Sequence, residues 1–533
     1  MVGVRYDHPR SLMAPPDRPS SRVDVTLLGI LLAALAIRLW HLDTPLIDAH
    51  SWRQVTNADI ARHFTEGSLN LFRPRVSWGG LDGVVGMEFP LLQWLTGILW
   101  RVTGESYAIA RLVAIAFSMA GVVSVYGLGA RLFGRPAGLG AALLMSTSPS
   151  IVYFGRSFLS DTPMLTFMIA AVWAWDVYFE RPSPGRATWA SALTALAALV
   201  KLPAILVLAP IVGTAWRHRK WRAFTDAGAW VGGLAAVAVT AAWYWHSDRI
   251  FLETGLTQAV FRPSGTYPAS VAPGVTFKLV SHWATMSRLG SSGFWFELGD
   301  RFWILHLTAV GAVAALYGWL RMRRAPARAV VDLWALAGLA FVVVAAEGQY
   351  WHEFHQLPVL GPFLLAFGVA VAPIFDAEWR ARTLPARWGT PALTLIVALV
   401  AVQSVRTSGV ERNLYRPDNL QDELLEAGEA VREATATGGL VITVEYSEYG
   451  VNSPMLLYFA HRQGWSFDTH SLTIAEIEWL RTQLGARYVA TNQWAELVHD
   501  VRDVASFLEA TYKEIPFPAG PDTLRLFDLG QRR

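Results

Sequence analysis

The feature that most constrains this chain is a series of long apolar segments. Segments such as 25–42, 137–153, 229–245, 302–320 and 354–372 approach the roughly 20 residues that a helix needs to cross a bilayer. Charged residues make up only 16% of the sequence, against about 25% in an ordinary soluble domain. A soluble enzyme can bury one or two such helices, but not this many. The sequence therefore predicts a polytopic α-helical membrane protein.

The positions of the basic residues predict which ends of these segments face the cytoplasm. They gather in the N-terminal tail and in alternate connections, which the positive-inside rule places in the cytoplasm. They are Arg5, Arg10, Arg18, Arg22, Arg131, Arg135, Arg181, Arg186, Arg217, Arg219, Lys220, Arg222, Arg321, Arg323, Arg324, Arg328, Arg380, Arg382 and Arg387. Because topology explains this charge, no nucleic-acid partner is expected. Residues 1–24 are predicted to be a disordered cytoplasmic tail.

The same rule decides the place of segment 89–103. Because Arg131 and Arg135 must be cytoplasmic, segment 107–132 runs from outside to inside, and 89–103 makes no net crossing. As a helix it reaches only about 22 Å, so we expect a juxtamembrane or re-entrant helix. About eleven transmembrane helices remain, and an odd number places the C-terminus outside. They are expected at 25–42, 107–132, 136–153, 162–179, 187–200, 202–216, 226–246, 302–320, 329–346, 354–373 and 389–406.

This topology divides the chain into a transmembrane domain, 25–406, and a smaller C-terminal domain. Two long external loops, 43–106 and 247–300, interrupt the first. Residues 415–533 form a predicted extracytoplasmic α/β domain, because polar helical stretches alternate there with short β-like runs. The helices are expected at 420–435, 474–484 and 501–512, and the strands at 440–444, 488–490 and 524–527.

A first polar cluster follows the first apolar segment. Asp48 could act as a general base toward an acceptor hydroxyl, and Arg53 could bind a phosphate through two hydrogen bonds. His50 lies between them. The alternative is an interfacial loop whose Trp52 and Arg53 anchor it at the lipid headgroups.

Further polar residues occur at the outer ends of later segments. Arg156 and Asp161 precede one, although Asp161 could simply cap its helix. Lys201 lies between two apolar segments, as a snorkelling cation or as the partner of a buried anion. A third group consists of Tyr350, His352 and His355. The alternative for this group is a hydrated aromatic belt. Ionisable residues in such places are costly, so each is a functional candidate.

Together these residues supply what a site needs to stabilise a phosphate leaving group and to deprotonate a hydroxyl. A divalent metal could bind through Asp48, His50, Asp161 and His352. However, the sequence has no HExxH motif and no tight carboxylate cluster, so a required metal is the less favoured of the two alternatives. The chain has no cysteine, which excludes disulfides and thiolate ligands.

An ordered series of motifs over residues 25–375 resembles the GT-C glycosyltransferases, in particular glycosyltransferase family 39. That branch includes protein O-mannosyltransferases and the lipid A aminoarabinose transferase. The series consists of the Asp48 motif, Phe89-Pro90-Leu91-Leu92-Gln93-Trp94-Leu95, Ala110-Arg111-Leu112, Arg131-Leu132-Phe133-Gly134, Arg156 with Asp161-Thr162-Pro163-Met164, Lys201-Leu202-Pro203, and His355-Gln356-Leu357-Pro358.

The resemblance implies a GT-C fold and transfer of a hexose or pentose from a polyprenyl-phosphate donor to an extracytoplasmic glycan, lipid or protein hydroxyl. Asp48 would be the general base of an inverting transfer, and Asp161 matches the second acidic position. Arg53, Lys201 and Arg156 would hold the lipid phosphate. Where many relatives carry an acid next to the first Asp, this chain has Ala49 and then His50, which could orient the acceptor or bind a metal.

The composition, rich in Ala, Arg, Gly and Val, suggests a bacterial source, and hence the plasma membrane with the site outside. The alternative function is a transporter or flippase of lipid-linked glycans. It would predict internal repeats and polar or broken segments near the bilayer midplane. The sequence has no evident repeat, and its charges gather at the outer ends. A receptor or scaffold would leave Asp48, Asp161 and Lys201 without a purpose.

Overall fold

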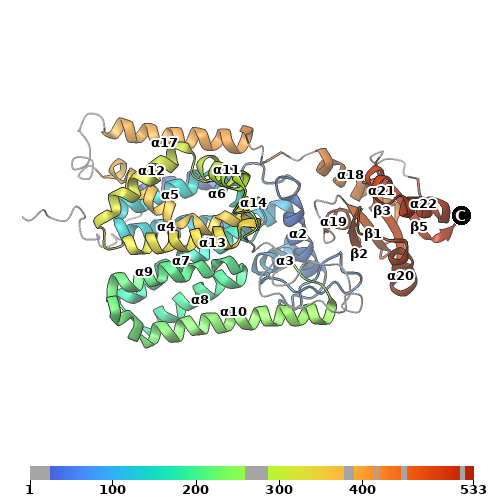
Figure 1. Cartoon of the computed structure of the whole chain (residues 1–533), viewed down its shortest axis with the longest axis horizontal. Helices are drawn as coiled ribbons and strands as arrows, with labels where there is room; N and C mark the ends of the chain where they lie inside the picture. Colours follow the sequence, from blue (N-terminus) through green and yellow to red (C-terminus); the bar gives the residue numbers. More distant parts are fainter. Residues whose placement is uncertain are drawn as a thin grey trace, which may run out of the picture.

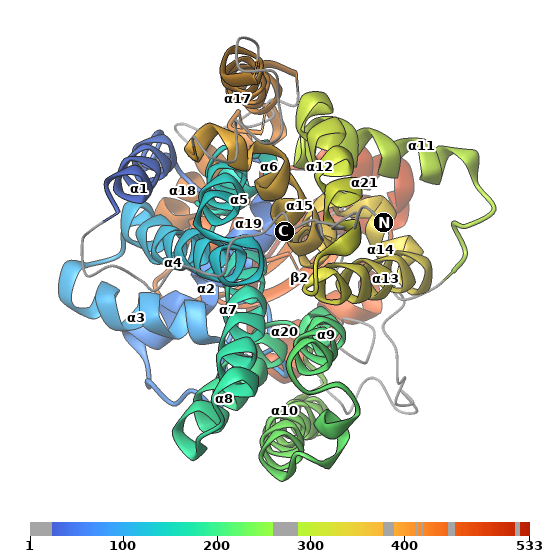
Figure 2. The same ribbon diagram turned by 90° about the vertical axis from the view of Figure 1, so that its left-hand side faces the viewer.

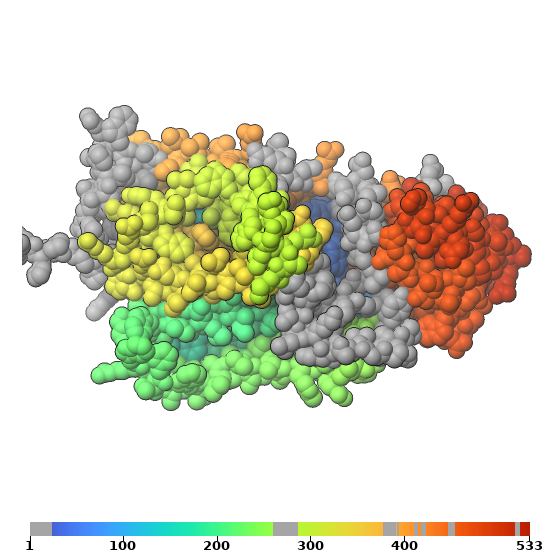
Figure 3. All heavy atoms as spheres, viewed as in Figure 1, coloured from blue at the N-terminus to red at the C-terminus, as the bar shows by residue number. Residues whose placement is uncertain are grey.

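The computed structural model describes residues 24–258, 286–376, 389–411, 414–416, 419–445, 453–516 and 523–533. The expected tail before residue 24, most of the second external loop and the basic connection at Arg380, Arg382 and Arg387 lie outside these residues. A helical bundle occupies one end of the elongated molecule, and the C-terminal unit forms a separate lobe at the other end (Figures 1 and 3).

The apolar segments form helices because a helix satisfies its own backbone hydrogen bonds where water is excluded. Each of the segments expected to cross the membrane overlaps a helix. The bundle consists of α1 (Val25–Arg38), α4 (Tyr107–Phe133), α5 (Arg135–Thr147), α6 (Pro149–Phe154), α7 (Asp161–Glu180), α8 (Pro184–Val200), η1 (Leu202–Val207), α9 (Leu208–Arg219), η2 (Lys220–Thr225), α10 (Ala227–Thr254), α11 (Ser292–Asp300), η3 (Arg301–His306), α12 (Ala309–Arg321), η4 (Met322–Arg324), α13 (Arg328–Val344), α14 (Ala346–Trp351), η5 (Glu353–Val359), α15 (Gly361–Val371), η6 (Ala372–Phe375), α17 (Gly389–Arg406) and η7 (Thr407–Glu411).

Within the described part of the chain, three helices, α4, α7 and α10, are long and apolar enough to cross a membrane. The number rises to five if each of two sharply bent helix pairs is counted as one span. The expected eleven crossings therefore remain a prediction.

Three of the expected spans are not continuous helices. Segment 302–320 is broken between η3 and α12, where the axis turns by 93°, and segment 354–373 is broken between η5 and α15, with a turn of 62°. Segment 136–153 is divided into α5 and α6 at Ser148. Prolines explain two of the breaks, because Pro149 and Pro362 lack the N–H that would continue the helical hydrogen bonds.

Glycines bring the central helices of the bundle close together. A side-chain carbon on Gly318 of α12 would collide with the carbonyl oxygen of Ala366 in α15, and one on Gly368 with that of Ala137 in α5. Such contacts let backbones approach closely and increase van der Waals packing between apolar helices. By contrast, α10 lies at the edge of the bundle beside α8 and α9 (Figure 2), and only 22% of its apolar window is buried.

The first long loop forms α2 (Ser51–Glu66) and α3 (Leu91–Thr103), which lie between the bundle and the C-terminal unit (Figure 1). Although α2 is polar, most of it is buried. Its Arg62 makes a bidentate ion pair with Glu105, 2.8 Å through each oxygen, and donates to the carbonyl of Tyr458 in the C-terminal unit, 2.6 Å away.

The C-terminal unit contains a mixed five-stranded sheet in the order β2-β1-β3-β5-β4. Strand β1 is parallel to β2 and β3, whereas β5 is antiparallel to β3 and β4. Three strands were expected; β2 and β4 were not, because each is short. The elements are α18 (Asn419–Ala434), β1 (Leu440–Glu445), α19 (Met455–Phe459), β2 (Gly464–Asp468), α20 (Ile474–Leu484), β3 (Ala486–Thr491), α21 (Trp494–Asp500), α22 (Arg502–Thr511), β4 (Tyr512–Glu514) and β5 (Arg525–Arg532).

Backbone hydrogen bonds join this unit to the first loop. The N–H of Gly80 donates to the carbonyl of Gly464, 2.7 Å away, and the N–H of Gly464 donates to the carbonyl of Ser77, 2.9 Å away. The loop thus pairs with the start of the edge strand β2 and covers backbone groups there that no other strand binds.

Candidate active site

An ion pair between Asp161 and Lys201 lies at the centre of the candidate site. Asp161 opens α7 and Lys201 ends α8, and Lys201 Nζ lies 2.7 and 2.8 Å from the two oxygens of Asp161. The Asp161 side chain is only 2% exposed. Ser160, not Asp161, occupies the cap position of α7. The capping alternative is therefore wrong, and the buried anion expected beside Lys201 is Asp161.

Glu88 lies beside this pair and was not expected from the sequence. It stands just before α3, held by hydrogen bonds from Phe89 N to the Leu199 carbonyl, 2.9 Å, and from Trp243 Nε1 to the Met87 carbonyl, 3.1 Å. Part of its surface stays accessible, although protein atoms surround it closely. Burial raises the pKa of Glu88 to about 7, while the charges of Lys201 and Arg53 oppose the rise.

Arg53 approaches the same point from the start of α2. Its guanidinium donates to Gln258 Oε1, 2.8 Å away, and lies 4.3 Å from the centre of the Trp52 ring. The charges of Arg53, Lys201 and Asp161 all act on the pKa of Glu88, and Lys201 is hydrogen-bonded to Asp161, so these four side chains form one electrostatic group. The sequence signal that could have identified Glu88 was an acidic residue directly before the apolar segment 89–103.

Histidines from two distant segments border this group. His50 Nε2 lies 2.9 Å from Glu353 Oε1, and the ring of His50 is 5.9 Å from that of His352. Burial lowers the pKa of His352 to about 3, helped by the neighbouring positive charges of His50 and Arg53, so this imidazole is neutral at physiological pH. Burial alone would raise the pKa of Glu353, but the charge and hydrogen bond of His50 lower it well below its usual range.

The short helix η5 carries the last of these side chains. His355 Nδ1 lies 3.1 Å from the carbonyl of Gly348, and the Phe354 ring is 4.8 Å from Lys201 Nζ. Tyr350 lies apart, with its ring 4.5 Å from the guanidinium carbon of Arg288. The sequence therefore identified His50, His352 and His355 as members of this region, but it missed Glu353.

Asp48 and Arg156 belong to a second, more deeply buried group. Asp48 Oδ2 accepts from Arg111 at 3.1 Å and from Arg156 at 3.3 Å, and Oδ1 accepts from Gln54 at 2.6 Å. Arg156 also donates to the carbonyl of His41, and neither arginine side chain is exposed. Both oxygens of Asp48 are thus engaged with cationic or amide donors.

The expected metal ligands do not form a metal site. Among the residues that the structure describes, no three His, Cys, Asp or Glu side chains lie together in a way that could hold a metal ion. Instead, Asp48 binds two arginines, Asp161 binds Lys201, and His50 binds Glu353.

The resemblance seen in the sequence is confirmed by two comparisons. Residues 88–245 match the family model described as dolichyl-phosphate-mannose-protein mannosyltransferase. The fold matches ArnT from Cupriavidus metallidurans bound to undecaprenyl phosphate, with a TM-score of 0.63 and 15% identity over 95% of this chain and 98% of that one.

A second solved structure, of a longer chain, has a similar fold. The archaeal oligosaccharyltransferase AglB from Archaeoglobus fulgidus, in complex with an inhibitory peptide and a dolichol-phosphate, aligns with a TM-score of 0.52 and 12% identity. The alignment covers 93% of this chain and 73% of that one. No curated protein matches the sequence significantly.

Proposed function

We propose that this protein is a glycosyltransferase that moves a sugar from a polyprenyl-phosphate donor to an extracytoplasmic acceptor. The observation that carries the proposal is the convergence of Arg53 and Lys201 with Glu88 and Asp161 at one end of a GT-C bundle. Cations can hold the phosphate of a lipid donor, and a carboxyl group can accept the proton of an attacking hydroxyl.

The donor class is supported by the ligands in the similar structures, which are undecaprenyl phosphate in ArnT and dolichol-phosphate in AglB. In this chain, Arg53 and Lys201 are the cations best placed for that phosphate, because both side chains are partly accessible. Arg156 was expected to contribute, but it is fully buried against Asp48. We therefore propose a structural role for Arg156.

The reaction follows from these roles. The acceptor oxygen attacks the anomeric carbon from the side opposite the phosphate, so a new carbon–oxygen bond forms while the bond from sugar to phosphate breaks. The configuration at that carbon is inverted. The proton of the acceptor hydroxyl passes to a carboxylate of the protein, and the polyprenyl phosphate leaves with a charge that Arg53 and Lys201 stabilise.

Two carboxyl groups compete for the proton. Family resemblance favours Asp48, which remains a prediction. The environment favours Glu88, because its side chain is partly accessible and a pKa of about 7 suits a base that must accept and release a proton near neutral pH. Both oxygens of Asp48 are already engaged, Oδ2 by Arg111 and Arg156 and Oδ1 by Gln54. We propose that Glu88 accepts the proton and that Asp48 positions the start of α2 through Gln54.

We place the protein in the bacterial plasma membrane as a multi-pass protein, with eleven crossings and a cytoplasmic N-terminus. The active site and the C-terminal unit are then extracytoplasmic, where the acceptor is a glycan, lipid or protein hydroxyl. The C-terminal unit is bonded to the first loop beside the site, which supports a role in acceptor contact. The fold of a sugar-transferring family favours this function over a transporter or flippase.

The test begins with mass spectrometry of lipids that copurify with the protein. The polyprenyl-phosphate sugar found is then used as donor in a transfer assay with extracytoplasmic acceptors. The expected result is transfer by the wild type and loss of transfer by Lys201→Met. Parallel reactions with and without EDTA test metal dependence. Donor consumption that Lys201→Met leaves unchanged would contradict the proposal.

A further inference from the structure

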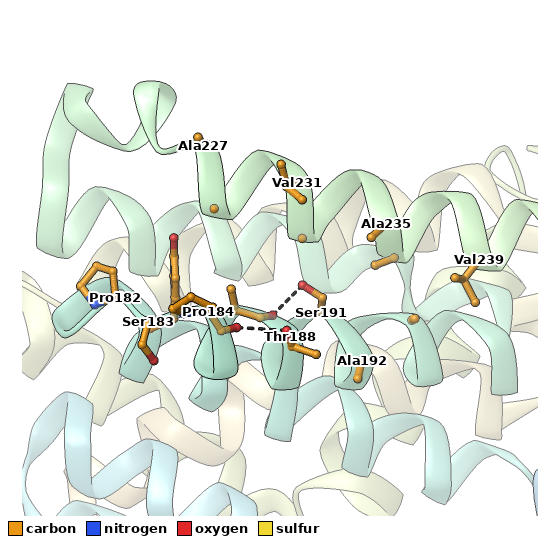
Figure 4. A pocket seen from close by; sticks show the side chains of 16 residues that line it. Pro182, Ser183, Pro184, Thr188, Ser191, Ala192, Ala227, Val231, Ala235 and Val239 are labelled. Atoms are coloured by element: carbon orange, nitrogen blue, oxygen red, sulfur yellow. Dashed lines mark hydrogen bonds between the residues drawn. The ribbon is translucent and has the colours of Figure 1, made fainter.

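A groove on the bundle surface begins at the end of α8 opposite to Lys201. It has a volume of 720 Å³ and runs between α8 and α10. Figure 4 shows Pro182, Ser183 and Pro184 at the end near Ala227, and Ala192, Ala235 and Val239 toward the other end. Its lining is almost entirely apolar. Many of the lining residues are Ala and Gly, whose small side chains leave the space between the two helices unfilled.

We propose that this groove binds a hydrocarbon chain of an anionic phospholipid from the cytoplasmic leaflet. The inference rests on the membrane placement given above, but not on sugar transfer. The groove follows α10 from Ala227 to Val239, about 18 Å at 1.5 Å per residue. That length is close to half of the bilayer core, about 15 Å. A chain of one leaflet would therefore fill it.

The headgroup class follows from the charges at the polar end. Arg181 and Arg186 flank Pro182–Pro184, and Lys220 and Arg222 lie in η2, immediately before α10; all four side chains are exposed. The acidic side chains nearby are already paired: Glu180 with Arg131, and Asp226 with Tyr178 and Arg219. The end of the groove therefore presents an excess of positive charge that complements a lipid phosphate.

The position of the groove argues against the tail of the donor as its occupant. Lys201, the proposed phosphate ligand, lies at the opposite end of α8 from Pro184. A lipid whose phosphate lies beside Arg181 and Arg186 therefore has its headgroup at the end of the bundle opposite to Lys201. A stable lipid in this place would also cover α10, which is poorly buried by protein.

The experiment compares the phospholipid retained by three proteins after reconstitution with phosphatidylglycerol and phosphatidylcholine and mild re-extraction, measured by native mass spectrometry. Ala192→Phe with Ala235→Phe fills the groove from its exposed sides. Ala238→Phe, exposed on α10 but outside the groove, is the matched control. A lipid that loses contact with a few methylene groups binds about tenfold more weakly. We therefore expect phospholipid retention to fall at least tenfold in the groove variant and to stay unchanged in the control.

Headgroup selectivity is tested with Arg181→Gln and Arg186→Gln, which should abolish the preference for phosphatidylglycerol. Equal phospholipid retention by the wild type and the groove variant would overturn the inference. So would a bound mass corresponding to detergent only or to a polyprenyl phosphate. Wild-type protein that transfers sugar but retains no phospholipid would overturn this inference alone and leave the proposed function standing.

Discussion

Lys201 and Asp161 form a bidentate ion pair that joins the end of α8 to the start of α7, with distances of 2.7 and 2.8 Å. Their side chains are 13% and 2% exposed, so neither charge is well solvated without the other. The pair therefore fixes two helix ends, while the ammonium remains partly accessible to a substrate.

Removing one partner of this pair should destabilise the protein. Asp161→Asn leaves the Lys201 ammonium without its counter-charge, at an expected cost of about 3–5 kcal/mol in the free energy of unfolding. The double variant Asp161→Leu with Lys201→Met removes both charges and should recover most of that stability. It should still lose transfer, because no cation remains there for the donor phosphate. Thermal unfolding and transfer assays measure the two effects separately, and a double variant with wild-type turnover would contradict the assignment.

Glu88 should control the pH dependence of transfer. Its carboxyl must be ionised to accept a proton, so the rate should rise with pH through a pKa of about 7. Glu88→Gln should lower turnover by about 10²–10⁴-fold and remove that inflection. The matched control is Glu445→Gln, because Glu445 is also buried with a pKa of about 7 but lies in the C-terminal unit. An unchanged pH profile in Glu88→Gln would show that another group is the base.

Asp48 should contribute to stability as well as to activity. Asp48→Asn leaves the buried guanidiniums of Arg111 and Arg156 without a carboxylate, at a cost of about 3–5 kcal/mol. We expect a lower unfolding temperature together with reduced transfer. If Asp48 were the base instead, Asp48→Asn would abolish transfer even in the fraction of the protein that remains folded. Measuring both quantities on the same preparation distinguishes the two roles.

Glu445 should make the C-terminal unit less stable at higher pH. Burial raises its pKa to about 7, although it accepts from Ser453 Oγ at 2.6 Å and Leu456 N at 3.1 Å. Below about pH 4.5, the pKa of this carboxyl in the unfolded protein, Glu445 is protonated in both the folded and the unfolded state. As pH rises from about 4.5 to about 7, the unfolded state ionises first, so stability falls by up to about 3 kcal/mol.

Glu445→Gln cannot ionise and should be more stable than the wild type at about pH 8, while differing little at about pH 4.5. Thermal unfolding followed by near-ultraviolet circular dichroism at both pH values measures this. A wild-type unfolding temperature with the same pH dependence as the variant would contradict the predicted ionisation.

The topology can be tested by labelling, because the chain contains no cysteine. Gly185, at the start of α8, and Gly299, in α11, are exposed, and a side-chain carbon at either would meet no atom within 4 Å. In intact cells, a membrane-impermeant maleimide should label Gly299→Cys but not Gly185→Cys. Both should be labelled after lysis. Labelling of Gly185→Cys in intact cells would reverse the proposed orientation.

Local pattern was enough to predict much of the architecture. Apolar length located a helix at each expected segment, and alternation of helical and β-like runs located β1, β3 and β5. These features depend on neighbouring residues along the chain. The breaks at Ser148 and before α12 and α15 were missed, because apolar length alone does not distinguish a straight helix from a bent pair.

The sequence by itself determined the helical, apolar character of the chain, the C-terminal α/β unit and the polar residues from which a site could be built. The tertiary structure alone decided their pairing: Asp161 with Lys201, Asp48 with Arg111 and Arg156, and Glu88 beside Arg53. The physical reason is that a carboxyl group's pKa and role depend on its burial and on nearby charges. Those neighbours come from distant helices, so no local pattern could distinguish the deeply paired Asp48 from the partly buried Glu88.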